Sequence, residues 1–159
     1  MSSCSTGKGT VGLMKARYEN LDEYITDLKE GIASSPGCAG HYYNLGMAYL
    51  NKRDFLEAEK AFLEAVRQSP HMAEAYVQLG GIAMQRGDLE GCLNYNTEAV
   101  NARPRFAIGW GNIGFVHIQR GEAEKAIPAL TKALKWDPKF IQAQASLAAA
   151  WHIDRKSVV

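Results

Sequence analysis

The sequence predicts an all-α solenoid of antiparallel helix pairs with a 34-residue period. Three sets of residues carry this prediction, because each recurs at the same spacing. They are four prolines (Pro36, Pro70, Pro104, Pro138), four glycines (Gly12, Gly46, Gly80, Gly114) and the apolar residues beside the glycines (Val11, Leu45, Leu79, Ile113, Leu147). Self-similarity at one fixed period of this length is the sequence signature of stacked helical repeats.

The segment 39–72 illustrates the predicted pair most clearly. Apolar residues of its first half lie on one face of a helix (Tyr42, Leu45, Tyr49). The second half, "FLEAEKAFLEAVRQ", again places apolar residues at helical spacing. Asp54 and Glu57 form a predicted capping box at the start of this second helix, and Pro70 ends it.

The remaining segments follow in chain order. Residues 1–8 are a predicted tail, and residues 9–38 are a degenerate copy in which Asn20 and Glu23 mark a second capping box. Residues 73–106 and 107–140 are complete copies. Residues 141–159 repeat only the first helix, so they form either a capping helix or the start of a further repeat.

These units resemble tetratricopeptide repeats (TPR). The family pattern is an aromatic residue, Leu-Gly and Tyr in the first helix, then Ala, an aromatic residue, Ala and Pro in the second. Segment 39–72 matches throughout (Tyr42, Leu45, Gly46, Tyr49, Ala58, Phe62, Ala65, Pro70). Segment 73–106 departs at Cys92 and Asn96, and segment 107–140 has His117 in place of tyrosine. The resemblance covers nearly the whole chain and implies a right-handed superhelix whose concave groove binds a peptide or a partner helix.

The resemblance also implies that a second stripe of each first helix lines this groove. The expected groove residues are Tyr43, Asn44, Met47, Val77, Gln78, Gly81, Met84, Gly111, Asn112, Phe115 and Ile118. Gly81 and Gly111 would thin the groove floor, and we expect Gly111 to make room for a ligand. Alternatively, Met84 and Ile118, together with Leu50, only pack adjacent repeats, since an apolar stripe at helical spacing is usually core.

The helix that begins near Ala107 carries three glycines within six residues. Each glycine costs a helix interior roughly 1 kcal/mol relative to alanine. Gly114 lies where the pattern requires two helices to approach closely. Gly109 has no explanation in the pattern beyond a close helix approach.

Three side-chain amides in the groove are also 34 residues apart: Asn44, Gln78 and Asn112. A side-chain amide both donates and accepts, so it can pair with both groups of an extended peptide backbone. Stacked repeats would then present a ladder of amides that binds the backbone of a peptide whatever the sequence of that peptide. The alternative is that an amide before Leu-Gly is simply common in the repeat.

Some family members clamp an acidic peptide tail with groove lysines and an arginine. The corresponding positions here hold Gly9 or Tyr43, and Ile108 and Asn112, so these cations are absent. An apolar or amphipathic peptide therefore suits the groove better than an acidic tail.

The composition argues against several other classes of function. The chain has 18 basic and 17 acidic residues, and a net charge of +1 gives no electrostatic case for nucleic acid or an anionic membrane. The four histidines have no cysteine or carboxylate neighbour at metal-ligand spacing. We therefore expect a non-catalytic protein without metal or cofactor.

Cellular location is predicted from what the sequence lacks. No apolar run is long enough to span a bilayer, and the N-terminal residues have no apolar signal region. Three widely spaced cysteines (Cys4, Cys38, Cys92) favour free thiols in a reducing compartment. The cytoplasm is the expected location.

The last helix is almost uncharged, although the end of a solenoid usually has a polar outer face. One apolar stripe should cover the preceding repeat (Phe140, Ala143, Leu147, Trp151). Ala145, Ala149 and Ile153 would then stay exposed, which suggests self-association or a chain that continues beyond Val159.

The leading hypothesis is thus a protein–protein interaction module that binds a peptide segment in a largely uncharged groove. The alternatives are a structural scaffold that self-assembles through its ends, or the TPR arm of a larger protein.

Overall fold

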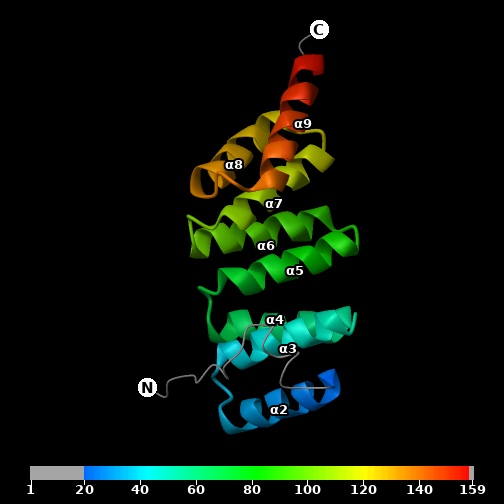
Figure 1. Cartoon of the computed structure of the whole chain (residues 1–159), viewed down its shortest axis with the longest axis vertical. Helices are drawn as coiled ribbons and strands as arrows, with labels where there is room; N and C mark the ends of the chain where they lie inside the picture. The colour runs from blue at the N-terminus through cyan, green and yellow to red at the C-terminus, as the bar shows by residue number, and fades with distance from the viewer. Residues whose placement is uncertain (1–19, 158–159) are drawn as a thin grey trace. The chain divides into compact units, whose positions relative to one another are not determined.

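The computed structural model describes residues 20–157, and this part of the chain forms eight helices and no strand (Figure 1). The helices are α2 (Leu21–Ser34), α3 (Ala39–Asn51), α4 (Phe55–Gln68), α5 (Ala73–Gln85), α6 (Leu89–Ala102), α7 (Ala107–Gln119), α8 (Ala123–Trp136) and α9 (Ile141–Ser157). The all-α fold predicted from the 34-residue period is confirmed. The predicted tail and residues 9–19 of segment 9–38 lie outside the described residues.

The chain divides into two compact units, residues 1–75 and residues 76–159, with the division inside α5. In the first unit, α3 packs against both α2 and α4. Its core is a cluster of residues from these three helices (Tyr24, Ile25, Leu28, Leu45, Ala48, Ala61). Phe62 of α4 is fully buried and fills the space in front of Gly46.

In the second unit, α7 packs against α6 and α8, and α9 packs against α8 and α7. Two core clusters show how its helices join. One combines Ala83 of α5, Cys92 of α6 and Val116 of α7. The other brings residues of α8 and α9 together (Ala126, Leu130, Ala133, Ala143, Ala150).

Side-chain caps begin the second helix of two pairs. Asp54 accepts a hydrogen bond from the backbone N–H of Glu57, and Asp88 accepts one from Gly91. These caps satisfy backbone donors that the first turn of a helix leaves unpaired. The predicted cap at Asn20 is also present, although its side chain accepts from Asp22 rather than from Glu23.

The turns between paired helices use one backbone conformation at equivalent positions. Arg53, Gly87 and Gly121 are 34 residues apart and have φ of 60°, 77° and 73°. This left-handed region favours glycine because it has no Cβ. The turn after α3 therefore places an arginine in a conformation that the other two turns give to glycine.

The cysteines differ from the sequence prediction in one respect. Cys92 is a free, buried thiol, and burial raises its pKa. Cys38, buried at the start of α3, is disulfide-bonded, so the prediction of free thiols is wrong for this residue. Cys4 lies outside the described residues.

Candidate functional site

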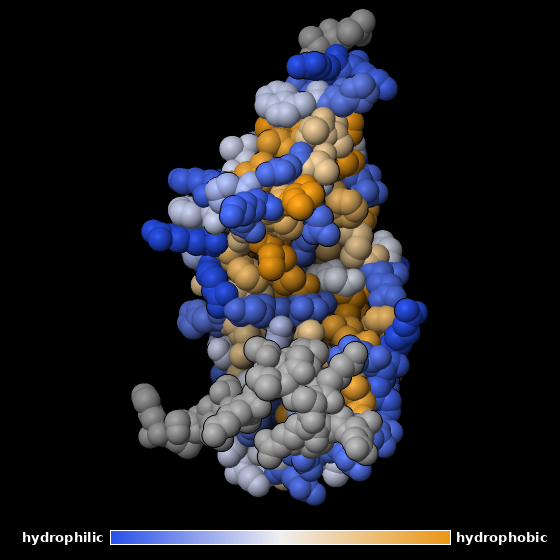
Figure 2. All heavy atoms as spheres, viewed as in Figure 1, coloured by the Kyte–Doolittle hydropathy of each residue, from blue (hydrophilic) through white to orange (hydrophobic). Residues whose placement is uncertain are grey.

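The second unit contains an open pocket of about 420 Å³ between α7 and α9. It is lined by Gly111, Asn112, Phe115, Phe140, Gln142, Ala143, Ala145 and Ser146. None of these side chains is charged, and they combine apolar surface with two amides and one hydroxyl. In Figure 2, apolar residues of the second unit gather along the middle of the visible face, with hydrophilic residues on either side.

The three glycines of α7 each admit a different neighbour. A Cβ on Gly109 would lie 2.7 Å from Val100 Cγ1 of α6, and one on Gly114 would lie 2.4 Å from Leu130 Cγ of α8. Both distances are well inside van der Waals contact. Three packing requirements, and not one, therefore explain why this helix tolerates the propensity cost of glycine.

Gly111 has a different role from the one that the sequence suggested. Its Cβ position lies 2.6 Å from Phe140 Cε1, so the ring of Phe140 occupies the space that we expected a ligand to take. Gly111 still lines the pocket, but as the seat of Phe140. Gly81, which lies one period before Phe115, would place a Cβ that meets nothing within 4 Å.

Asn112 makes one hydrogen bond, and it crosses from α7 to α6. Its Nδ2 donates to Asn96 Oδ1 at 3.0 Å, while Asn96 Nδ2 donates to the backbone carbonyl of Cys92 at 2.8 Å. Asn96 is completely buried, so these bonds satisfy a polar group that would otherwise be costly. The bond orients the Asn112 amide and uses one of its two N–H donors, and Asn112 also lines the pocket.

The other expected groove residues of the second unit divide into two groups. Phe115 is 42% exposed and lines the pocket. Met84 and Ile118 are partly buried and pack against core clusters. Val77 and Gln78 are half-buried on α5.

In the first unit, the expected groove residues all come from α3. Tyr43 packs its ring against Phe62, with ring centres 5.6 Å apart. Asn44 and Met47 are half-buried, and no charged residue stands among the three.

The sequence reasoning missed four pocket residues (Phe140, Gln142, Ala143, Ser146) as groove candidates and assigned a fifth, Ala145, to self-association. The 34-residue period could have found two of them. Ala145 is one period beyond Gly111, and Ser146 is one period beyond Asn112. Extending the groove stripe into the last helix would therefore have predicted that α9 forms one wall.

The last helix buries a slightly different stripe from the predicted one. Phe140, Ala143 and Leu147 pack against α8, but the stripe ends at Ala150, and Trp151 is 49% exposed. The expectation that Trp151 covers the preceding repeat is therefore wrong. A step of three residues from Leu147, in place of four, keeps the same face of the helix buried and turns the indole outward.

The self-association residues proposed from the sequence lie on several parts of α9. Ala145 and Ala149 are exposed, whereas Ile153 is half-buried beside the turn between α7 and α8. Ile141, at the start of α9, is 76% exposed. Ile141 and Trp151 thus present more apolar surface than the three residues expected.

His117 has a structural partner. Its Nδ1 lies 2.7 Å from Glu122 Oε2, and because an ionised carboxylate can only accept, the imidazole donates. This hydrogen bond is the largest cause that lowers the pKa of Glu122. Among residues 20–156, no three histidine, cysteine, aspartate or glutamate side chains are grouped to hold a metal ion.

No helix in the described part of the chain has the length and apolar character required to cross a membrane.

Two family models, each described as "Tetratricopeptide repeat", match residues 27–91 and 107–140. None of the curated proteins is detectably similar in sequence. The fold is similar to that of two solved structures of the protein MamA. One is 24% identical with a TM-score of 0.77, and the match covers 91% of this chain and 79% of the MamA chain. The other is 20% identical with a TM-score of 0.72, and covers 95% and 98%.

A further similar structure is that of YrrB, described as a TPR protein with an unusual peptide-binding site. It is 18% identical and has a TM-score of 0.72, and the match covers 91% of this chain and 74% of the YrrB chain.

Proposed function

This chain belongs to the tetratricopeptide repeat family of protein–protein interaction modules, and we propose that it is non-catalytic and binds a peptide segment of a partner protein. The peptide is extended or amphipathic, and a largely uncharged groove receives it. The observation that carries this proposal is the pocket between α7 and α9, where exposed Phe115 stands beside the oriented amide of Asn112.

The pocket has the two properties that peptide recognition needs. Its volume of about 420 Å³ accommodates one or two apolar side chains, and burial of each contributes roughly 1.5–3 kcal/mol. The amides of Asn112 and Gln142 and the hydroxyl of Ser146 can pair with the backbone of the same peptide. The absence of charge among the lining residues favours apolar anchors over an acidic tail.

The amide ladder expected from the sequence has fewer free hydrogen-bonding groups than expected. One N–H of Asn112 is committed to Asn96, so Asn112 offers a peptide one donor and one acceptor. Ser146 continues the series one period later with a hydroxyl. YrrB, a protein of similar fold, is described as having a peptide-binding site, which supports a peptide as the class of ligand.

A pair of matched substitutions on α9 tests the proposal. Peptides are first selected from a random displayed library against the wild-type chain. Ala145→Trp places an indole in the pocket, whereas Ala148→Trp adds the same side chain to an exposed position that does not line it. We expect Ala145→Trp and Asn112→Ala to weaken the selected peptides at least tenfold and Ala148→Trp to leave their affinity unchanged. Equal affinity for wild type and Ala145→Trp would contradict the proposal.

A second candidate function is self-assembly through the last helix. The exposed apolar side chains of Ile141 and Trp151 favour it, because contact with a second copy would remove their apolar surface from water. Ala145 and Ala149 lie on the same helix and would permit close approach of a second copy.

The cytoplasmic location stays a prediction.

A further inference from the structure

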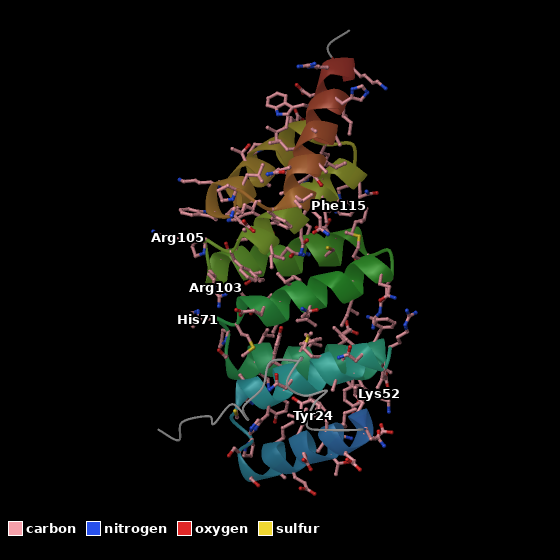
Figure 3. The ribbon with its side chains drawn as sticks, in the orientation of Figure 1. Tyr24, Lys52, His71, Arg103, Arg105 and Phe115 are labelled. Carbon is pink, nitrogen blue, oxygen red and sulfur yellow. The ribbon has the colours of Figure 1, made fainter. Side chains whose placement is uncertain are left out.

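A second surface of the second unit is basic and aromatic, and the groove does not include it. We call it the basic edge. It consists of the loop between α6 and α7, the first turn of α7, the second half of α8 and the turn before α9, and its members are Arg105, Trp110, Lys132, Lys135, Trp136 and Lys139. None of these residues lines the pocket between α7 and α9. In Figure 3, Arg105 projects from one side of the second unit and Phe115 lies toward the other.

Three cations of the basic edge are held over indole rings. Arg105 Cζ lies 5.1 Å and Lys135 Nζ 4.8 Å from the centre of the Trp136 ring. Lys132 Nζ lies 4.2 Å from the centre of the Trp110 ring. A cation at such a distance is attracted by the ring quadrupole, so the rings restrict where the charges point. This ordering lowers the entropy that a ligand must remove when it binds.

Cations outnumber carboxylates along the basic edge. Residue 105 and segment 131–140 include four basic residues and one acidic residue, Asp137. The carboxylate of Asp137 accepts a hydrogen bond from the backbone N–H of Lys139. Among the described residues, no carboxylate is ion-paired with Arg105, Lys132, Lys135 or Lys139, in contrast to Lys60, Lys125 and Arg120 elsewhere. Such a concentration of one sign of charge attracts an anionic ligand.

We propose that the basic edge binds an acidic segment of a protein, a short run of aspartate or glutamate residues. Carboxylates fit the donors present, since the Arg105 guanidinium can donate two parallel hydrogen bonds to one carboxylate and the lysines act as point charges. Single-stranded nucleic acid fits less well, because its bases stack on free aromatic faces and here the indoles already carry cations. This site is separate from the proposed groove and does not depend on it.

The test uses a deca-glutamate peptide as the probe and the full chain as the receptor. Binding is measured by calorimetry and by indole fluorescence, since Trp136 is 37% exposed and lies beside two of the cations that a carboxylate would contact. We expect saturable binding that weakens as salt rises, because exposed charges are screened. The variant Arg105→Ala/Lys132→Ala/Lys135→Ala should bind about tenfold more weakly.

The matched control is Lys29→Ala/Lys60→Ala/Lys125→Ala, which removes the same charge from exposed positions outside the basic edge. It should retain wild-type affinity for the peptide. Circular dichroism checks that both triple variants are folded, and Lys139→Glu, at an exposed position of the basic edge, provides an independent loss of affinity. Three results would overturn the proposal: no saturable binding, equal weakening by the two triple variants, or binding of a deca-thymidine strand as tight as that of the peptide.

Discussion

Single residues decide how closely the paired helices approach. In each pair, one glycine of the first helix faces one side chain of the second helix. Gly46 faces Phe62, Gly80 faces Asn96, and Gly114 faces Leu130, with each pair separated by 16 residues. In all three, a Cβ on the glycine would lie 2.4–2.8 Å from the facing side chain. The position thus accepts an aromatic ring, an amide or a leucine, provided that its partner has no side chain.

Substitution of two helix glycines should therefore act in opposite directions. Gly114→Ala brings Cβ to 2.4 Å from Leu130 Cγ, and overpacking of this kind costs about 1–3 kcal/mol. Gly81→Ala meets nothing within 4 Å and should gain up to about 1 kcal/mol from helix propensity. Urea denaturation measures both free energies of unfolding. A Gly114→Ala variant as stable as wild type would show that the two helices can move apart at no cost.

At the scale of elements, the turns between paired helices share one backbone conformation but differ in the residue that adopts it. Gly87 and Gly121 adopt φ of 77° and 73° without penalty, while Arg53 adopts 60°. A left-handed conformation costs an L-residue roughly 1–2 kcal/mol. Replacing such a residue by glycine removes this cost, but part of the gain in stability is lost because glycine also makes the unfolded chain more flexible.

Arg53→Gly should accordingly stabilise the first unit by up to about 1 kcal/mol. Gly87→Ala is the reverse test, since its Cβ meets nothing within 4 Å and any loss is conformational. It should destabilise the chain by about 1 kcal/mol. Thermal unfolding of both variants measures these changes. Destabilisation by Arg53→Gly would mean that the arginine side chain contributes more than its backbone costs.

The turn between α7 and α8 should make stability depend on acid. The His117 hydrogen bond lowers the pKa of Glu122 below its ordinary value of 4.5, so the ionised carboxylate stabilises the folded state. That contribution is complete above pH 4.5 and is lost as the pH falls from there through the lowered pKa. Glu122→Gln should thus be less stable than wild type at neutral pH, and the two should converge in acid. A constant difference across the titration would assign the effect of the substitution to packing instead.

The sequence predicted the helices, but it predicted only part of the candidate site between α7 and α9. Prolines, capping aspartates and the apolar period place α3 to α8, because these signals act within a few residues. The filling of the Gly111 site by Phe140 depends on how the chain turns after α8, and no local pattern encodes that turn. Likewise, the periodicity of α9 allows either Ala150 or Trp151 to end its buried stripe, and only packing against α8 selects Ala150.

For the molecule as a whole, the exposed apolar residues of α9 predict association between copies. Sedimentation of the wild-type chain should depend on concentration at tens of micromolar, roughly the range where modest interfaces form. Ile141→Ser/Trp151→Ser should remain monomeric. Leu56→Ser/Leu63→Ser removes two exposed apolar residues of α4 and serves as the matched control. A wild-type chain that is monomeric throughout, or loss of association in the control, would contradict self-assembly through α9.

Peptide binding beside α7 and α9 is the central claim, and chemical-shift mapping of the isotope-labelled chain tests it most directly. A library-selected peptide is titrated while the side-chain amide of Asn112, the backbone amides of Phe115 and Ala145 and the indole of Trp136 are followed. Binding in the groove predicts large shifts of Asn112, Phe115 and Ala145, and little change at Trp136. Shifts that cluster at Trp136 and leave Asn112 and Ala145 unmoved would place the peptide on the basic edge and contradict the groove.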